Sequence, residues 1–355
     1  MGVLRGLSIF GGGNFHTRRA DVRMIAVKTT LQSHGMPRIV LIALFISTAA
    51  AAQTAAPYPH KLIRLIVTAA AGSGPDITAR IVAQKLSLAL GQSVVIENRA
   101  GAGGSIAAEL AAKAPPDGYT LVMASAGSHA VSPALYPKLA WDPVRDFAPV
   151  TLVSVAPNIL IVHPSLPVKS VRELVALAKA RPGQLSFGSG GSGSTAHLSG
   201  ELFRSMANIA VVHVPFKGAP SAALGVISGQ VEMGLLNLPP TLPQVRSGRL
   251  KGLAVSTAKR VNAIPELPTI AEAGVPGYEA STWYGVMAPA GTPAEIIARL
   301  HALITADLRT DDTRGRIVAD GGEVVGSTPE EFAAVLKRDL AKWTKVVRES
   351  GARAD

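Results

Sequence analysis

The stretch Leu62-Ile63-Arg64-Leu65-Ile66-Val67, followed by Ala69-Ala70-Ala71-Gly72-Ser73-Gly74-Pro75-Asp76, decides the fold class of this chain. Its first six residues are an apolar run of strand length, and residues 77–90 carry apolar side chains at helical spacing. The glycines between them allow a tight turn, and Asp76 and Gly91 are the predicted N-cap and C-cap of the helix. A buried strand that leads through a glycine turn into a helix is the repeating unit of α/β folds.

The same alternation continues along the chain. Residues 94–96 and 121–123 are further predicted strands, and a helix is predicted between them over residues 106–114. A second cycle of strands and helices is predicted at 158–162, 171–180, 185–187, 196–206, 211–214, 221–228, 231–235 and 250–255. We therefore expect parallel sheet covered by helices on both faces, with ligands beyond the carboxyl ends of the strands.

Two similar lobes are the arrangement that this order of elements favours. The chain is predicted to cross between the lobes near residues 158–162 and again near 283–288. Lobe 1 then comprises residues 57–157 plus 281–355, including predicted helices at 294–308 and 329–349, and lobe 2 comprises residues 158–280. Because both ends of the mature chain fall in one lobe and the other lobe is inserted, the cleft between them would be hinged.

Residues 1–56 are predicted to be an N-terminal extension and signal peptide. Met36-Pro37-Arg38 precedes the apolar run of residues 39–49, and Ala50-Ala51-Ala52 follows it. This is the order of a basic n-region, an h-region and an A-x-A cleavage site, so we expect cleavage near 52/53. The apolar run is shorter than a membrane-spanning helix requires. The sequence therefore predicts a protein exported to the periplasm.

The charge and cysteine content exclude several classes of function. The formal net charge is +11, but six cations and one carboxylate lie in the first 52 residues, which leaves 29 Lys and Arg against 23 Asp and Glu, or +6. These charges are scattered and aromatic residues make up only 5% of the chain, so no nucleic-acid partner is expected. With no cysteine, the chain has no disulfide and no thiolate nucleophile. We expect neither a metal site nor a cofactor.

A second glycine-rich loop, Gly188-Ser189-Gly190-Gly191-Ser192-Gly193-Ser194-Thr195, lies between a predicted strand and a predicted helix. It matches the G-x-G-x-x-G pattern of dinucleotide sites, but the next strand is followed by Pro215-Phe216-Lys217, with no acidic residue to bind a ribose. We therefore reject that interpretation. Backbone N–H groups at a helix N-terminus, together with hydroxyl donors, suit a carboxylate instead.

The candidate ligand-binding residues come from four segments that follow predicted strands. Ser125-Ala126-Gly127-Ser128-His129 would complete one wall of the cleft, and Lys217-Gly218 would add a cation or backbone amides, although a solvated lysine is an equal alternative. Asp76 is expected mainly to cap its helix, and it has the chemistry to accept a proton from a ligand. The candidates are Ala70, Ala71, Gly72, Ser73, Gly74, Asp76, Ser125, Gly127, Ser128, Ser189, Gly190, Ser192, Gly193, Ser194, Thr195, Lys217 and Gly218.

No catalytic residue is assigned. The histidines are dispersed, and the sequence holds no G-x-S-x-G nucleophile motif and no P-loop. His197 lies in the first turn of the helix after the second loop, where we expect it to brace the loop rather than contact a ligand, because a helix N-terminus disfavours imidazolium.

Many spaced blocks of residues 57–351 closely resemble one family, the Bug proteins, which are extracytoplasmic solute receptors of tripartite tricarboxylate transporters. The blocks include Ala71-Gly72-Ser73-Gly74-Pro75-Asp76, Glu97-Asn98-Arg99, Pro116-Asp117-Gly118-Tyr119, His213-Val214-Pro215-Phe216-Lys217-Gly218 and Ala288-Pro289-Ala290-Gly291-Thr292-Pro293. The resemblance implies a type II periplasmic-binding-protein fold, with two α/β lobes around a hinged cleft. It also implies a monomer that binds a small carboxylated solute and delivers it to transporter membrane subunits. In this family the first-lobe loop typically holds one carboxylate through main-chain groups and bridging water.

Two departures from the family pattern concern the ligand. Thr68 and Ala69 stand where the family usually has proline and phenylalanine, and Leu236 stands before Asn237 where it often has aspartate. Both are expected to make the pocket roomier or less polar, which favours a larger or more apolar carboxylate. A ligand-sensing receptor for a membrane signalling partner and an exported α/β enzyme acting on small acids remain the alternative functions.

Overall fold

The described part of the chain begins after the predicted signal peptide. A computed structural model describes residues 58–136, 138–319 and 321–352, all of which belong to one folded unit that spans Ala56–Asp355. The predicted extension, signal peptide and cleavage position therefore lie outside the described residues. Within the described ranges, no helix combines the length and the apolar character that a membrane crossing requires.

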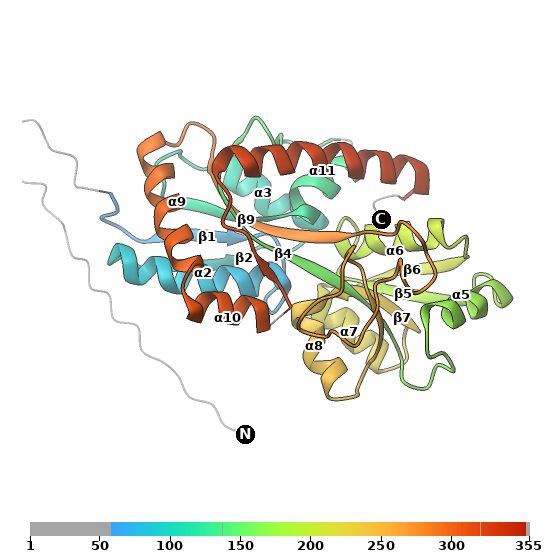
Figure 1. The fold of residues 1–355 in the computed structure, drawn as a ribbon. Coiled ribbons are helices and arrows are strands. Elements are labelled where there is room, and N and C mark those ends of the chain that lie inside the picture. The colour runs from blue at the N-terminus through green and yellow to red at the C-terminus, as the bar shows by residue number, and fades with distance from the viewer. Residues whose placement is uncertain (1–57, 137, 320, 353–355) are drawn as a thin grey trace, which may run out of the picture. The chain divides into compact units, whose positions relative to one another are not determined.

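Strands from both halves of the chain join in a single sheet (Figure 1). Its main path has the order β2-β1-β3-β9-β4-β7-β5-β6, and β8 and β10 also pair with β4. The strands are β1 Ile63–Val67, β2 Val94–Asn98, β3 Thr120–Ser125, β4 Phe147–Val162, β5 Leu185–Ser189, β6 Val211–Pro215, β7 Met233–Asn237, β8 Lys251–Val255, β9 Ser281–Pro289 and β10 Glu323–Val324.

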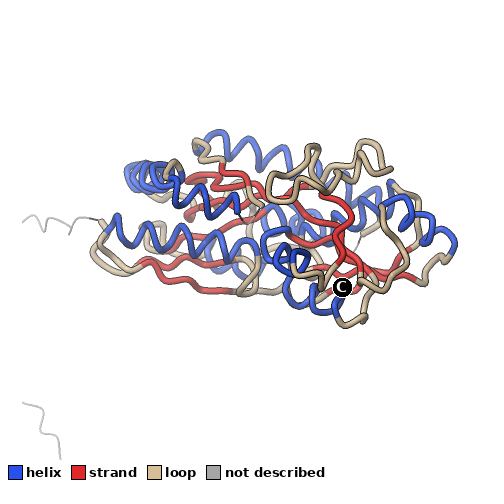
Figure 2. Tube along the Cα trace, turned by 60° about the horizontal axis from the view of Figure 1, so that its bottom comes forward, coloured by secondary structure: helices blue, strands red, loops and turns tan. Residues whose placement is uncertain are grey.

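Helices flank the strands on both sides, as the turned view of Figure 2 shows. The longest, α11, packs on strand β4 and on helix α6, which follows β5. The α-helices are α2 Gly74–Leu90, α3 Ser105–Ala112, α4 Ser132–Leu135, α5 Val171–Ala180, α6 Thr195–Met206, α7 Ala219–Ile227, α8 Leu238–Arg246, α9 Ala294–Leu308, α10 Asp311–Ala319 and α11 Pro329–Ser350. Two further turns are helical, the 3₁₀ turn η1 Ala102–Gly104 and the π-helical turn η2 Gly127–Val131.

The first strand group, β1 to β3, and the second strand group, β5 to β7, are each parallel. Strands β4 and β9 run between the two groups and pair antiparallel along residues 147–157 and 281–289 (Figure 1). From Asn158 onward β4 pairs antiparallel with β7 and β8 instead. The expectation of purely parallel sheet is therefore wrong for its middle.

Only residues 158–162 of β4 are predicted as a strand from the sequence, and the remaining part contains Pro149 and Pro157. A proline cannot donate to a strand ladder, so it argues against a strand unless it lies at an irregularity or an edge. The pairing of β4 with β9 shifts register between Pro149 and Thr151, where such a residue is tolerated. Prolines also hid α8, which begins Leu238-Pro239-Pro240 and contains Pro243.

Alternation along β1 divides the core between the two faces of the sheet. Ile63, Leu65 and Val67 are fully buried in a cluster that includes residues of α2 and α9. Ile66 points the other way, into a cluster with Ala108 of α3. Because both faces of the strand are covered, β1 reads as a nearly continuous apolar run.

The start of α2 differs from its prediction. The helix begins at Gly74 with Ser73 as N-cap, so Asp76 is its third residue and not its N-cap. Pro75 occupies the first turn, where its missing N–H costs nothing. Gly91 ends the helix in a left-handed conformation with φ 64°, as predicted.

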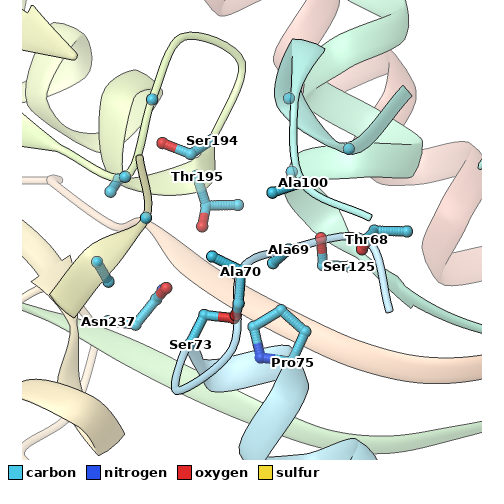
Figure 3. A pocket seen from close by; sticks show the side chains of 18 of the residues that line it. Thr68, Ala69, Ala70, Ser73, Pro75, Ala100, Ser125, Ser194, Thr195 and Asn237 are labelled. Carbon is cyan, nitrogen blue, oxygen red and sulfur yellow. The ribbon is translucent and has the colours of Figure 1, made fainter. Parts of the chain in front are cut away.

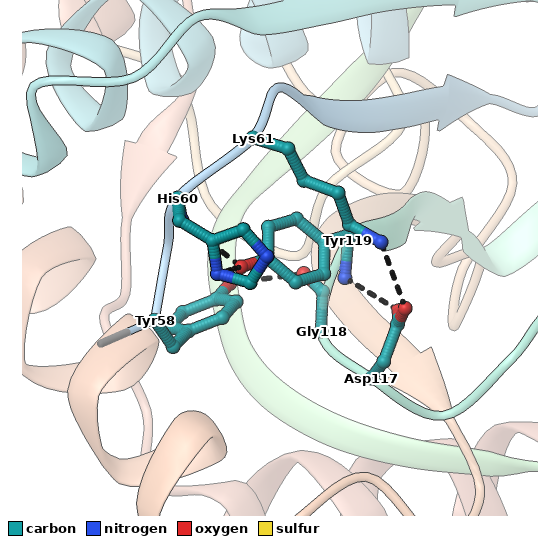
Figure 4. Close-up of polar contacts among 6 residues, drawn as sticks. All are labelled: Tyr58, His60, Lys61, Asp117, Gly118 and Tyr119. Atoms are coloured by element: carbon teal, nitrogen blue, oxygen red, sulfur yellow. Dashed lines mark hydrogen bonds and ion pairs between the residues drawn. The ribbon is translucent and has the colours of Figure 1, made fainter. Parts of the chain in front are cut away.

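Polar contacts anchor the chain just before β1 (Figure 4). The Tyr58 hydroxyl donates to the Gly118 carbonyl at 2.9 Å, and the His60 N–H donates to the Tyr119 hydroxyl at 3.0 Å. Lys61 pairs with Asp117 at 3.3 Å and lies over the Tyr119 ring. These contacts join the entry to β1 to the turn that precedes β3.

Candidate functional site

A cavity of about 470 Å³ lies where the carboxyl ends of β1 and β3 face the loops that follow β5 and β6. Figure 3 shows Ser194 and Thr195 on one side of it and Thr68, Ala100 and Ser125 on the other. Its wall is built from Thr68, Ala69, Ala70, Ser73, Pro75, residues 100–104, Ser125, Gly127, Tyr136, residues 190–192, residues 194–196, residues 216–219, Asn237, Thr282 and Tyr284. Lys217 is the one charged residue that the described structure places on this wall.

The loop after β1 contributes Ala70 and Ser73 to the cavity wall. The carboxylate of Asp76, which follows this loop, does not line the cavity. Asp76 is 1% exposed, and its oxygens accept hydrogen bonds from the Gly72 N–H at 2.8 Å, Arg80 Nε at 2.9 Å and Asn98 Nδ2 at 2.9 Å. Asn98 also donates to the Ala69 carbonyl at 3.1 Å. Asp76 therefore holds the shape of the loop from behind.

Burial and hydrogen bonding act on Asp76 in opposite directions. Burial disfavours its charge, but the hydrogen bonds from Arg80, Gly72 and Asn98 outweigh burial and hold the pKa of the carboxyl below its usual value. The group is thus a structural carboxylate at neutral pH. All three of these donors are directed at its charge, which disfavours the alternative that it accepts a proton from a ligand.

The segment after β3 also contains residues that line the cavity and a buried residue that supports them. Ser125 and Gly127 line the cavity. Ser128 is buried behind them, where its hydroxyl exchanges hydrogen bonds with Ser125 and lies 2.8 Å from His129 Nδ1. Complete burial lowers the pKa of His129 to about 3, so its imidazole is neutral at physiological pH.

The loop after β5 is braced by two stacked imidazoles. Gly188 and Ser189 still belong to β5, so the loop is shorter than predicted, and Ser189 Oγ lies 2.6 Å from His213 Nε2. The His213 ring stacks on His197 at 4.0 Å between centroids, and His197 Nδ1 accepts a hydrogen bond from the Gly193 N–H at 3.3 Å. Ser194 caps α6 by accepting from the His197 N–H at 3.1 Å. His197 is 2% exposed, so it is buried beneath the loop, where the His213 ring stacks on it.

Glycines allow the two sides to approach closely around the cavity. A Cβ on Gly193 would lie 3.1 Å from the Gly103 Cα, and a Cβ on Gly218 would lie 3.1 Å from the Ala70 Cβ. Both glycines have positive φ, 81° and 107°. Side chains at these positions would therefore hold the two sides apart.

The structure gathers most of the predicted residues at the cavity, and the others are their neighbours in sequence. Those on the wall are Ala70, Ser73, Ser125, Gly127, Gly190, Ser192, Ser194, Thr195, Lys217 and Gly218. Those that do not line the cavity are next to wall residues in sequence: Ala71 and Gly72, which are exposed, and Gly74, Asp76, Ser128, Ser189 and Gly193, which are buried.

The predicted residues leave out several parts of the wall, including Tyr136 at the end of α4. Residues 100–104 follow β2 and contain Gly101, Gly103 and Gly104, each with positive φ, so their glycine content was the available signal. Asn237 ends β7, where its side-chain amide donates to Asn158 at 2.8 Å. Thr282 lies in β9, where no local pattern distinguishes it from a core residue. The neighbouring aromatic pair Trp283-Tyr284 is compatible with the floor of a cleft and at least as well with core packing, and the structure places Tyr284 on the cavity wall.

The departures from the family pattern have different outcomes. Thr68 and Ala69 line the cavity, as their interpretation requires. Leu236 is completely buried in a core cluster with Ile159 and Val226, on the opposite face of β7 from Asn237. The expectation that Leu236 changes the polarity of the pocket is therefore wrong.

Residues 78–352 match the TctC family, described as "Tripartite tricarboxylate transporter family receptor". This chain belongs to that family. BugT from Bordetella pertussis is 37% identical over 318 residues, which cover 89% of this chain and 98% of BugT. The resemblance to Bug proteins is thereby confirmed.

Solved structures of similar proteins share the fold of this TctC receptor. Rpa4515 of R. palustris, solved with adipate, is 40% identical with a TM-score of 0.82, covering 84% of this chain and all of that one. MatC from Rhodopseudomonas palustris, solved with bound malate, is 32% identical with a TM-score of 0.78, covering 82% of this chain and all of MatC. The TctC receptor thus has the predicted type II periplasmic-binding-protein fold, with two α/β lobes.

Proposed function

We propose that this TctC receptor binds a small organic carboxylate in the cavity and delivers it to the membrane subunits of a tripartite transporter. The observation that carries the proposal is the composition of the wall. Hydroxyl groups of Ser73, Ser125 and Thr195 and the single cation Lys217 surround a space of about 470 Å³. Hydroxyls and a cation stabilise an anionic ligand, and the volume is typical of a small-molecule site.

Two helices strengthen the preference for an anion. Both α2 and α6 begin at the cavity, with Ser73 and Thr195 on its wall. The N-terminus of a helix carries partial positive charge and unpaired N–H groups. A carboxylate between them would be attracted from both sides of the cleft.

The lobes of this proposal are residues 57–157 plus 281–355 and residues 158–280. The change of partner along β4, from β9 to β7 and β8 at Asn158, supports this division. In a hinged receptor the ligand stabilises the closed state because it contacts both lobes there and only one in the open state. Gly193 and Gly103 approach each other closely and belong to different proposed lobes, so their contact is one that a closed state would contain.

The relatives agree with a carboxylate ligand. Rpa4515 was solved with adipate and MatC with malate, which are both organic acids. We further propose that the chain is exported by its cleaved signal peptide, acts as a monomer and releases its ligand chemically unchanged.

A thermal-shift screen of the protein without residues 1–52 tests this function. Acetate, hexanoate, malate, adipate and citrate represent mono-, di- and tricarboxylates of different lengths. At least one acid should raise Tm in a concentration-dependent way, since a ligand that binds only the folded state stabilises it. An unshifted Tm across the whole panel, or chemical conversion of a bound acid during prolonged incubation, contradicts the proposal.

A further inference from the structure

Two residues with side-chain hydroxyls, Thr282 and Tyr284, line the cavity from β9, the strand that pairs with β4 along the predicted crossing between the lobes. Thr282 and Tyr284 are two residues apart in β9, so their side chains share one face of the sheet. Both line the cavity, and they are 1% and 2% exposed. They are thus held by a strand and not by a mobile loop.

Neither hydroxyl has a hydrogen-bond partner within the described residues. A buried polar group without a partner costs free energy, and native proteins contain few such groups. The buried hydroxyl of Tyr278 shows the usual arrangement, because it donates to the Ser199 carbonyl at 2.9 Å. The hydroxyl groups of Thr282 and Tyr284 lack such a partner, so the free-energy cost of burying them requires an explanation.

The first loop makes room for one of these groups. A Cβ on Gly74 would clash with the hydroxyl of Tyr284 and lie 2.7 Å from its Cζ. Gly74 is helical and has no positive φ that would require glycine. The missing side chain at residue 74 lets the tyrosine reach the start of α2, beside the wall residues Ser73 and Pro75.

Both groups are suited to donate to an anion. Burial raises the pKa of the Tyr284 hydroxyl far above its usual value, so it keeps its proton at any physiological pH. A threonine hydroxyl is also a neutral donor. Neutral donors avoid the desolvation cost that a buried cation would add, and their hydrogen bonds to a charged acceptor are stronger than those to a neutral one.

We propose that Thr282 Oγ1 and Tyr284 Oη are specificity-determining donors that bind a carboxylate group of the ligand at the cavity floor. This inference rests on the proposed function, since it requires a carboxylate in the cavity. It assigns to β9 a role that the glycine-rich loops do not perform, which is to orient the ligand along the cleft by a side-chain contact.

The Tyr284 hydroxyl could instead pair with a buried water molecule, so the experiment must separate ligand binding from protein stability. Its side chain also borders a small hollow of about 10 Å³, shared with Ile77 and Ser154. A hollow of this size approaches the space that one water molecule needs. A water there would make the hydroxyl a structural group, and its removal would then destabilise the protein without ligand.

The test uses Thr282→Val and Tyr284→Phe, each with a matched control. Thr241→Val removes a completely buried threonine hydroxyl that also lacks a partner but lies in α8, away from the cavity. Tyr278→Phe removes a buried tyrosine hydroxyl that has a partner. Calorimetric titration measures the affinity for adipate and for hexanoate, which has the same chain length and one carboxylate. A melting curve without ligand measures stability.

We expect Thr282→Val and Tyr284→Phe each to weaken adipate binding about 10- to 100-fold, while Tm without ligand stays the same or rises. Loss for adipate alone assigns the floor to its second carboxylate, and loss for both acids assigns it to the carboxylate that they share. Thr241→Val should leave affinity unchanged, and Tyr278→Phe should lower Tm.

Three results overturn the inference. The first is an affinity of both floor variants within about twofold of the wild type, and the second is a clear fall in their Tm without ligand. The third is a wild-type protein that binds neither six-carbon acid, because the floor then fails to retain a carboxylate for which the cavity has room. The proposed function itself survives all three results as long as another acid of the panel binds.

Discussion

The loop after β1 and the loop after β5 both pass through glycine and serine into a helix, and each is held in place by different groups. In the first, the buried carboxylate of Asp76 binds the Gly72 N–H from inside the helix, and Ser73, the N-cap residue, makes no side-chain cap. In the second, Ser194 caps α6 directly, and the stacked rings of His197 and His213 support the loop from below.

The two loops divide the work between wall residues and supporting residues in the same way. In both loops buried polar side chains that do not line the cavity fix the backbone, and small residues such as Ala70 and Gly190 line it. A rigid loop loses less entropy when a ligand binds. The side-chain contacts that distinguish one acid from another are therefore expected elsewhere on the wall, which agrees with the role proposed for β9.

The largest expected effect comes from adding a side chain at a glycine that lines the cavity. Gly190→Val places a side chain on the cavity wall, with its Cβ 3.2 Å from the backbone nitrogen of Ala219. It should weaken binding more than about 100-fold, or ~2.7 kcal/mol.

Gly72→Val is the contrasting change, since its Cβ would meet only Pro220 at 3.6 Å. At φ 75° it should cost stability of ~1–2 kcal/mol and leave affinity within a few fold. Titration and urea unfolding of both variants measure these effects, and equal loss of affinity would show that the loops face the ligand in the same way.

Filling the glycine beneath the first loop tests the link between that loop and β9. Gly74→Ala forces its Cβ against the buried Tyr284 ring and should destabilise the protein by ~2–3 kcal/mol. Gly315→Ala is the control, because it lies in α10 with nothing within 4 Å and should stabilise the protein by ~0.5–1 kcal/mol. Urea unfolding measures both changes. Equal stability of the Gly74 variant and the wild type would show that Tyr284 is free to move.

The carboxylate of the first loop predicts a dependence of stability on pH. Because the pKa of Asp76 is lower in the folded protein than in the unfolded chain, its contribution is complete above about pH 4 and is lost as the pH falls through the folded value. Asp76→Asn should cost ~1.5–2 kcal/mol at pH 7. The difference between wild type and variant should shrink in acid, as urea unfolding between pH 3 and pH 7 would show. A constant difference would mean that the charge of Asp76 contributes nothing.

The smallest expected effect concerns the two N-caps. Ser194→Ala removes a hydrogen bond to the His197 N–H and should cost ~1 kcal/mol. Ser73→Ala should cost less, because Ser73 Oγ donates to the Ala70 carbonyl and does not cap α2. Unfolding free energies of the two variants measure these losses. A larger loss for Ser73→Ala than for Ser194→Ala would show that the first loop depends on Ser73.

Much of the fold could be predicted from local sequence. Helices α5 and α9 begin and end at the predicted residues, since their apolar spacing and flanking residues are local signals. Residues 147–157 of β4 could not be predicted, because they contain Pro149 and Pro157, and Pro149 is tolerated where the pairing with β9 shifts register. The start of α2 was misplaced because Asp76 has the chemistry of an N-cap and also of a third helical residue, and only the position of the Gly72 N–H decides between them.

The α/β fold class, the two glycine-rich loops and the family follow from local sequence, since strand–loop–helix units and spaced motifs are properties of consecutive residues. The tertiary structure decided which residues face the cavity. Leu236 and Asn237 are neighbours in sequence, but the pleat of β7 turns one into the core and the other onto the wall. Thr282 and Tyr284 become part of the site only because β9 crosses beneath loops that lie about a hundred residues away or more in the sequence. Such pairings depend on how strands assemble over long distances, and no local pattern records them.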